Sequence, residues 1–248
     1  MEKLKGKIAF ITGGSRGMGA AIAKRLSKAE ATVVFTHSGR NPEQAAYVLE
    51  QIKESGKNEG LSLVADNNDT QSLIDALKTT IDRYGTVDIL INNAGVYIDK
   101  PIVTYSLKDF EEVMNVNVKA VFVASQYVAR YMKRGGRIIT IGSNMAERLA
   151  FPGGSLYSMS KAALVGLTKG LARDLGSADI TVNLVQPGPV NTDMNPEDGA
   201  FATTIKEMMA IGRYGTVDEI AGLVSYLVSD EARFVTGTSI TIDGGFNI

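Results

Sequence analysis

Residues 7–29 read KIAFITGGSRGMGAAIAKRLSKA, a short apolar run that passes through a glycine-rich turn into an Ala-rich helical pattern. Gly13, Gly17 and Gly19 bracket this turn. Glycines let backbone N–H groups approach a phosphate, and the N-terminus of the following helix adds positive potential. The spacing G-x-x-x-G-x-G differs from the general G-x-G-x-x-G dinucleotide fingerprint, and glycines also form ordinary turns. Its position between a strand and a helix nevertheless predicts nucleotide binding.

Similar apolar runs alternate with helical patterns along the rest of the chain. The predicted strands are residues 7–13, 31–37, 61–66, 87–95, 136–143, 180–188 and 238–245. Their nearly continuous apolar character is typical of strands buried on both faces. Capping patterns and terminal glycines predict helices over residues 19–29, 41–56, 69–85 and 106–135. Repeated strand–helix units predict an α/β fold, a doubly wound parallel sheet of the seven strands with helices on both faces.

The composition excludes several classes of function. The 248 residues include 26 basic and 27 acidic side chains without a basic stripe, so nothing indicates a nucleic-acid partner. The chain has no Cys and one histidine, His37, which excludes disulfides, thiolate nucleophiles, Cys-ligated zinc and His clusters for a metal. We find neither a signal-peptide pattern nor an apolar run of about 18 residues. We expect one cytoplasmic domain over residues 1–248, with no membrane partner and no metal.

The end of the second predicted strand bears on which dinucleotide binds. An Asp or Glu there usually reads a ribose 2′-OH, whereas a 2′-phosphate needs positive or hydrogen-bonding groups. The sequence FTHSGRNPE at residues 35–43 has no acid before its last residue and places His37, Ser38 and Arg40 at this point. Arg16 of the glycine loop can reach the same region, and an Arg fork suits phosphate. Although a single loop Arg is often just a solvated cation, the set predicts NADP(H) in preference to NAD(H).

The segment YSMSK places Tyr157 four residues before Lys161, on one face of the first turns of a helix. Free tyrosine has a pKa near 10, and a neighbouring ammonium group lowers the pKa of a phenol. The pair is either a tuned acid/base or two unrelated surface residues. The spacing alone does not distinguish the two.

Taken together, the motifs resemble the short-chain dehydrogenase/reductase family, in its order and spacing over essentially the whole chain. They are TGGSRGMG (12–19), NNAG (92–95), NVNVKAVF (115–122), GRIITIGS (136–143), YSMSK (157–161), QPGPVNT (186–192) and FVTGTSITIDGG (234–245). The chain looks like NADPH-dependent 3-ketoacyl-carrier-protein reductases and related carbonyl reductases. The resemblance implies a single-domain Rossmann-type sheet, often within a homotetramer.

The resemblance also implies a catalytic tetrad, whose members here are Asn117, Ser143, Tyr157 and Lys161. Tyr157 would exchange a proton with the substrate oxygen, while Lys161, helped by the charge of the nicotinamide, would lower the pKa of Tyr157 and hold the ribose hydroxyls. Ser143 would hydrogen-bond the substrate oxygen. Asn is a poor helix former, and the family gives Asn117 a purpose, because its main chain binds a water that links Lys161 to solvent. The residues alone are equally consistent with a helix kink at Asn117 and a strand-end turn at Ser143.

Further cofactor contacts carry over from the family. Asp66 and Asn67 match the pair that holds the adenine, NNAG lines the cofactor or is simply a tight turn, and residues 187–192 match the loop that meets the nicotinamide amide. The complete expected cofactor set is Gly13, Ser15, Arg16, Gly17, Met18, Gly19, His37, Ser38, Arg40, Asp66, Asn67, Asn93, Ala94, Gly95, Tyr157, Lys161, Pro187, Gly188, Val190 and Thr192.

Two irregular segments are expected to shape the substrate pocket. Residues from about 192 to 215 interrupt the last crossover and form either a substrate lid or a surface loop with one amphipathic helix. Between Ser143 and Tyr157, Glu147 and Arg148 either pair with each other or bias the pocket against a long acyl chain. Candidates for an adaptable apolar pocket, each of which is equally a candidate core or oligomer contact, are Val96, Tyr97, Met145, Phe151, Met194, Phe201 and Met208.

We expect an NADP(H)-dependent carbonyl reductase or alcohol dehydrogenase that transfers hydride between nicotinamide and a ketone or aldehyde. A 3-ketoacyl-carrier-protein reductase proper is also consistent with the motifs, although no basic patch marks a docking site for an acidic carrier protein. A nucleotide-binding sensor on the same fold, or a structural subunit that binds cofactor without turnover, would share the same fold and glycine loop. The paired Tyr157 and Lys161 argue against a pure binder, which needs no acid/base.

Overall fold

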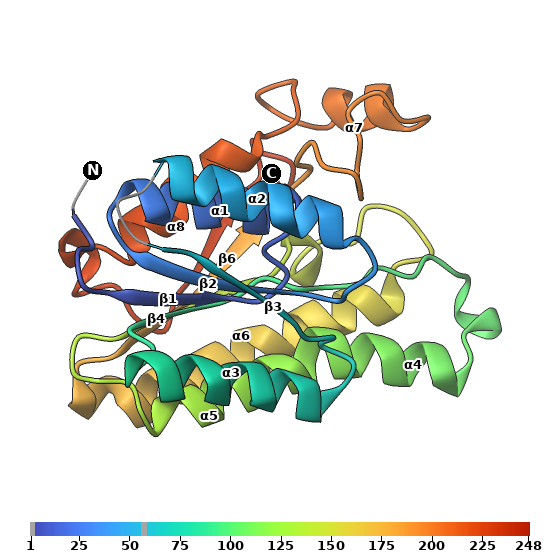
Figure 1. Ribbon diagram of the computed structural model, residues 1–248. Helices are drawn as coiled ribbons and strands as arrows, with labels where there is room; N and C mark the ends of the chain where they lie inside the picture. Colours follow the sequence, from blue (N-terminus) through green and yellow to red (C-terminus); the bar gives the residue numbers. More distant parts are fainter. Residues whose placement is uncertain (1–2, 56–58) are drawn as a thin grey trace.

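The computed structural model describes residues 3–55 and 59–248, and their centre is a sheet of seven parallel strands in the order β3-β2-β1-β4-β5-β6-β7 (Figure 1). The strands are β1 (Ile8–Ile11), β2 (Thr32–His37), β3 (Leu61–Val64), β4 (Ile89–Asn92), β5 (Arg137–Ile141), β6 (Thr181–Pro187) and β7 (Ser239–Ile242). Every one lies within a stretch predicted as a strand, and the predicted fold class is confirmed.

Helices cover both faces of this sheet. They are α1 (Gly17–Lys28), α2 (Pro42–Ser55), α3 (Thr70–Tyr84), α4 (Leu107–Met114), α5 (Ala120–Ala129), α6 (Ser155–Leu175), α7 (Ala202–Glu207) and α8 (Val217–Leu227). Figure 1 shows α1, α2 and α8 on one face and α3, α4, α5 and α6 on the other. No helix in the described part of the chain is long and apolar enough to cross a membrane.

The strand register explains why both faces are apolar. Phe10 of β1 lies between Val34 of β2 and Leu90 of β4, and the row continues through Ile138 to Val182. These five side chains are buried with α3, α5 and α6. Because successive strand residues point to opposite faces, the neighbouring row packs against α1 and α8 instead. A sheet buried on both sides leaves its functional groups at the strand ends.

The predicted helix boundaries were confirmed at some ends and not at others. Helix α3 begins after Asp69, whose carboxylate accepts from the backbone of Gln71 and Ser72, and stops at Gly85 with φ +79°. The predicted stop of α2 at Gly56 lies outside the described residues.

The helix predicted over 106–135 was wrong as one continuous element. A π-helical turn at Asn115–Lys119 separates α4 from α5, and α5 ends at Ala129 rather than near Gly135.

Candidate active site

Ser143 and Tyr157 come together at the carboxyl end of β5. Ser143 closely follows that strand, and its Oγ accepts a hydrogen bond from the Met145 backbone at 3.1 Å. Tyr157 stands in the first turn of α6, which Ser158 ties to the same loop by donating to the Met145 carbonyl at 2.6 Å. A side-chain hydrogen bond joins Tyr157 to Ser143. The structure therefore unites two of the predicted catalytic residues from different elements.

The environment of Tyr157 raises its pKa to about 12, chiefly because the phenol is buried. The hydrogen bond to Ser143 works in the opposite direction, and the nearby Tyr97 adds to the increase. The rings of Tyr97 and Tyr157 meet edge to face, with their centres 5.0 Å apart. The lowered pKa expected from the sequence depends on Lys161 together with the charge of the nicotinamide, whereas in the chain alone burial of the phenol dominates and raises the pKa. Tyr157 is thus a protonated donor at neutral pH.

Lys161 lies one helical turn after Tyr157 and is only 4 % exposed. Its Nζ donates to the Ile141 carbonyl at 3.0 Å and lies 5.5 Å from the centre of the Tyr157 ring. Burial lowers the pKa of Lys161 to about 8. The ammonium group therefore changes charge close to physiological pH, beside the tyrosine.

Asn117 lies in the π-helical turn between α4 and α5. Its side-chain oxygen accepts from the Val96 backbone N–H at 2.9 Å, and its Nδ2 donates to the Val96 carbonyl and to Ser160 Oγ, each at 3.0 Å. The side chain thus joins the loop after β4 to α6, next to Lys161. π-bulges are frequent at functional sites, and the role expected for the main chain of Asn117 stays a prediction.

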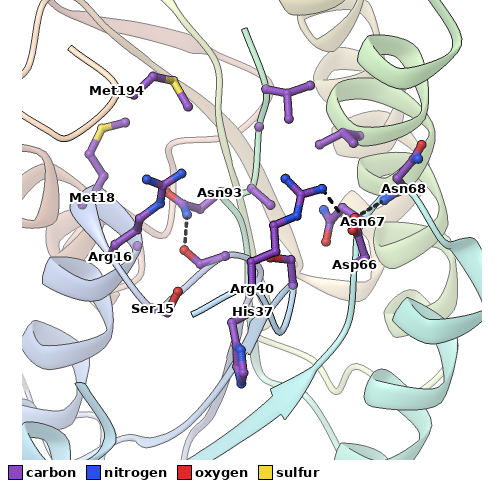
Figure 2. A pocket seen from close by; sticks show the side chains of 18 of the residues that line it. Ser15, Arg16, Met18, His37, Arg40, Asp66, Asn67, Asn68, Asn93 and Met194 are labelled. Atoms are coloured by element: carbon purple, nitrogen blue, oxygen red, sulfur yellow. Dashed lines mark hydrogen bonds and ion pairs between the residues drawn. The ribbon is translucent and has the colours of Figure 1, made fainter. Parts of the chain in front are cut away.

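A cavity of about 260 Å³ opens at the carboxyl ends of β1, β2 and β4. Figure 2 shows its polar side chains. Among the expected cofactor residues it is lined by Gly13, Ser15, Arg16, Gly17, Met18, Gly19, His37, Ser38, Arg40, Asp66, Asn67, Asn93, Ala94, Gly95 and Thr192. Our sequence reasoning missed Ala65, Asn68, Glu112, Val116 and Asp193, which also line it. Asn68, in the run VADNND, was the one that a sequence signal could have found.

The glycine loop is shaped for close approach of backbone to a ligand. Gly13 has φ +66°, which L side chains rarely adopt. A Cβ on Gly19 would lie 2.3 Å from the Gly13 carbonyl oxygen and 2.5 Å from Asn93 Nδ2. Asn93 Nδ2 also donates to the Thr12 and Gly13 carbonyls, which holds the loop against β4. This cradle in front of the α1 N-terminus fits the diphosphate of a dinucleotide.

Arg16 and Arg40 project in the same direction into this cavity (Figure 2). Arg16 Nη1 lies 3.6 Å from an Asp193 carboxylate oxygen, and Arg40 Nη2 lies 3.8 Å from one of Asp66. Both pairs are solvent-exposed and weak, so either guanidinium is available to an anionic ligand. The ring of His37 points away from them, and its Nδ1 accepts from the Gly39 backbone at 3.3 Å (Figure 2). Burial lowers the pKa of His37, which favours its neutral form.

A second cavity, of about 270 Å³, contains Ser143 and Tyr157. It meets the first through shared lining residues, Met18, Thr192 and Met194. Pro187, Gly188 and Val190, expected at the nicotinamide, line this second cavity. Of the pocket candidates, Tyr97, Met145, Phe151 and Met194 also line it, whereas Val96 lines the first cavity. Neither cavity is lined by Phe201, which is 73 % exposed, or by Met208.

The segment predicted as a lid contributes Met194 and Asn195 to the lining of this second cavity, together with Ile205, which belongs to α7. Figure 1 shows α7 standing apart from the layers around the sheet. Our sequence reasoning also missed Phe246, near the C-terminus, for which no motif gave a signal.

Glu147 and Arg148 bind different partners rather than each other. Gln186, at the end of β6, donates to Glu147 at 2.7 Å. Arg148 instead donates to the carbonyl of Phe246.

Known proteins resemble this chain over its full length. A family model described as enoyl-(acyl carrier protein) reductase matches residues 13–247. The cyclic-di-GMP-binding biofilm dispersal mediator protein of Escherichia coli is 40 % identical over 246 residues, covering 99 % of both chains. The 3-oxoacyl-(acyl-carrier-protein) reductase of Vibrio harveyi is 39 % identical over 246 residues, covering 98 % of both.

The solved structure of a short-chain dehydrogenase from Burkholderia cenocepacia, in complex with NADP, is 46 % identical and superposes with a TM-score of 0.97 over 100 % of both chains. Matches of about 40 % identity or more over nearly the whole chain, together with the seven-stranded parallel sheet, show that the chain is homologous to these proteins. The chain belongs to the short-chain dehydrogenase/reductase family of oxidoreductases.

Proposed function

We propose that this protein is an NADP(H)-dependent carbonyl reductase that interconverts a ketone or aldehyde and the corresponding alcohol. One observation carries the proposal: the apolar cavity lined by Ser143 and Tyr157 adjoins the cavity of the glycine loop, with which it shares Met18, Thr192 and Met194. A carbonyl group beside Tyr157 would therefore lie next to a dinucleotide held by that loop. The bound nicotinamide would supply or accept the hydride.

The side chains of this site would handle the substrate oxygen and its proton. In reduction, Tyr157 donates its phenolic proton to the carbonyl oxygen, and in oxidation the phenolate takes the proton of the alcohol. Ser143 hydrogen-bonds the same oxygen and stabilises the negative charge that develops there. The ammonium of Lys161 favours the phenolate that Tyr157 becomes when it gives up its proton, and also binds the ribose hydroxyls. Asn117 positions the loop of Val96 against α6 through its side-chain hydrogen bonds to Val96 and Ser160.

NADP(H) is the dinucleotide that the adenosine end of the cavity fits best. Two guanidinium groups, Arg16 and Arg40, face this end, and Ser38 adds a hydroxyl. Arginine binds phosphate oxygens with two parallel hydrogen bonds, so this group suits a 2′-phosphate. Support also comes from the Burkholderia cenocepacia relative, whose structure holds NADP.

A second candidate is reduction of a 3-ketoacyl group on an acyl carrier protein. It is favoured by the 39 % identity to the Vibrio harveyi reductase. The cavity has a volume of about 270 Å³ and is lined by Phe151 and Phe246, which favours a compact substrate. A 3-ketoacyl thioester, free and attached to carrier protein, tests this candidate directly.

A sensor of nucleotides is a candidate from another class, favoured by the 40 % identity to a cyclic-di-GMP-binding protein. Arg16 and Arg40 would suit the phosphates of such a ligand as well as a 2′-phosphate. If cyclic di-GMP competes with NADPH for the protein in a fluorescence titration, the role as a nucleotide sensor gains direct support.

The experiment that tests the main proposal follows NADPH oxidation by absorbance, with ketones, β-ketoesters, diketones, quinones and a 3-ketoacyl thioester. We expect turnover of at least one carbonyl compound. The Tyr157→Phe variant should keep NADPH binding and lose turnover by several orders of magnitude, because the proton donor is gone while the ring remains. Near-normal activity of Tyr157→Phe would contradict the acid/base role, and tight NADPH binding without any turnover would favour the sensor.

A further inference from the structure

We propose that the C-terminal tail, residues 243–248, forms a wall of the substrate cavity and limits the size of the carbonyl compound that enters. Phe246 is the wall, and Arg148 is the positioning residue that holds it. This inference rests on the proposed carbonyl reductase function and names the part of the chain that would set its substrate range.

Phe246 reaches the cavity from the end of the chain. Its side chain is 5 % exposed and lines the same cavity as Ser143 and Tyr157. Since the ring lies in the wall and not in the strands of the sheet, its removal enlarges the cavity without opening the core around β1 and β4. Phe246 is therefore placed to act on substrate size.

Arg148 fixes the position of that ring through two kinds of contact. Its Nη1 donates to the Phe246 carbonyl, and its guanidinium carbon lies 5.8 Å from the centre of the Phe246 ring. It also reaches the Ile248 carbonyl at 3.5 Å. Arg148 belongs to the loop that leads from Ser143 to Tyr157, and the adjacent Glu147 anchors this loop to the end of β6. The tail is thus attached to a loop that is itself fixed to the sheet.

A second attachment lies next to the catalytic serine. Asn144, which follows Ser143, donates from Nδ2 to the side-chain oxygen of Asn247 at 3.1 Å, and Asn247 Nδ2 donates to the Asn144 carbonyl at 3.2 Å. The Asp243 carboxylate accepts from the backbone N–H groups of Gly245 and Asn247, each at 3.0 Å. These bonds give the tail a defined turn instead of a free end.

The same tail packs against the segment predicted as a lid. Ile211 donates its backbone N–H to the Gly244 carbonyl at 3.0 Å, and a Cβ on Gly245 would lie 2.6 Å from the Cβ of Ala210. The tail that carries Phe246 is therefore held between the lid segment and the loop of Arg148. A tail held from both sides resists displacement by a substrate, so a larger carbonyl compound would have to distort one of these attachments.

The test compares two methyl ketones that differ by one fused ring, acetophenone and 2-acetylnaphthalene, with NADPH as reductant. Phe246→Ala should raise the ratio of kcat/KM for the naphthyl ketone to that for the phenyl ketone about tenfold, as expected for added space in an apolar pocket. Phe246→Leu, which keeps most of the volume, should shift the ratio less. Arg148→Ala should move the ratio in the same direction, mainly through KM, and Arg148→Lys should restore part of the effect.

Arg233→Ala serves as the matched control, because it removes an exposed arginine far along the chain from this loop. Folded Phe246→Ala and Arg148→Ala proteins with the wild-type ratio would overturn the inference. If the wild type reduces neither ketone, calorimetry measures the affinity of the NADP⁺-loaded protein for each ketone, and the ratio of the two affinities tests the role of Phe246 without turnover. An unchanged ratio of the two affinities in Phe246→Ala would then overturn the inference, whereas a shifted ratio supports it whatever the reaction proves to be.

The attachment of the C-terminal tail to Arg148 can also be tested without any ligand. Carboxypeptidase should release Ile248 several-fold faster from Arg148→Ala than from Arg233→Ala, because the former loses the bonds that hold the tail. Equal rates of release would contradict the role assigned to Arg148.

Discussion

At the scale of single residues, burial sets the protonation of Tyr157 and Lys161. The pKa of Tyr157 is raised to about 12 and that of Lys161 is lowered to about 8, so both shift toward the neutral form. The proposed reduction would require protonated Tyr157, and a pKa of about 12 keeps this form throughout the neutral range. The charge on Lys161, in contrast, is lost as the pH rises through about 8.

We therefore expect kcat/KM for carbonyl reduction to be highest below pH 8 and to fall as Lys161 loses its proton, because its positive charge favours proton release from Tyr157. The measurement is a pH profile of kcat/KM, which reports groups of the free enzyme. Lys161→Met should lower the rate and remove this inflection. An inflection that persists in Lys161→Met belongs to another group and would contradict the assignment.

The second prediction at this scale concerns the adenosine end of the cofactor cavity. Arg40→Asp, and Ser38→Asp as a separate variant, should weaken NADPH binding more than NADH binding, because a new carboxylate repels the 2′-phosphate and can accept from a 2′-OH. We expect Arg40→Asp to lower the NADPH/NADH affinity ratio by at least about tenfold, which corresponds to about 1.4 kcal/mol. Titration of both cofactors into both variants checks this. If neither variant changes the ratio, the phosphate site lies elsewhere.

At the scale of elements, the first βα unit depends on close approach between the glycine loop and α1. Gly19→Ala would force a methyl group against the Gly13 carbonyl and Asn93. We expect a loss of unfolding free energy of about 1–3 kcal/mol and weaker NADPH binding, because the loop must move. Denaturant unfolding and cofactor titration measure the two effects.

Gly176→Ala is the matched control at the end of α6. Gly176 has helical dihedral angles, φ −61° and ψ −36°, and a Cβ there meets no atom within 4 Å. This variant should be neutral or slightly stabilising and should bind NADPH normally. If the two variants behaved alike, steric contact at Gly19 would not be the cause.

The π-helical turn between α4 and α5 is the element that the sequence described least well. Helical spacing continues through NVNVKAVF, so the pattern predicted one helix. The extra residue in the turn is stabilised by contacts from distant parts of the chain, Val96 and Ser160, that bind Asn117. Local spacing carries no information about such partners.

At the scale of the whole molecule, we propose that the chain forms the homotetramer expected from its family. Several large apolar side chains on and beside α4 and α5 are exposed: Ile102, Val103, Leu107, Phe110 and Phe122. Exposed apolar side chains that lie together are typical of a surface that binds another protein chain, and we propose that these five residues belong to one.

Phe122 is 47 % exposed, and Phe122→Glu should dissociate the tetramer because the new carboxylate would be buried without a partner in the interface. Size-exclusion chromatography with light scattering measures the mass, and Tyr47→Glu, a change at an exposed position on α2, is the control. A wild-type protein that runs as a monomer would contradict the proposal, as would a tetramer unaffected by Phe122→Glu.

The sequence by itself determined the parallel sheet and its seven strands, because these depend on local apolar runs and glycine spacing, and its short motifs named the candidate tetrad through resemblance to a family. Only the tertiary structure decided that burial raises the pKa of Tyr157, that Arg148 binds the C-terminal tail instead of Glu147, and that Phe246 rather than Phe201 lines the cavity. Each of these results depends on contacts between residues far apart in the chain. Hydration and packing are set by what surrounds a side chain, and its neighbours in the sequence do not specify those surroundings.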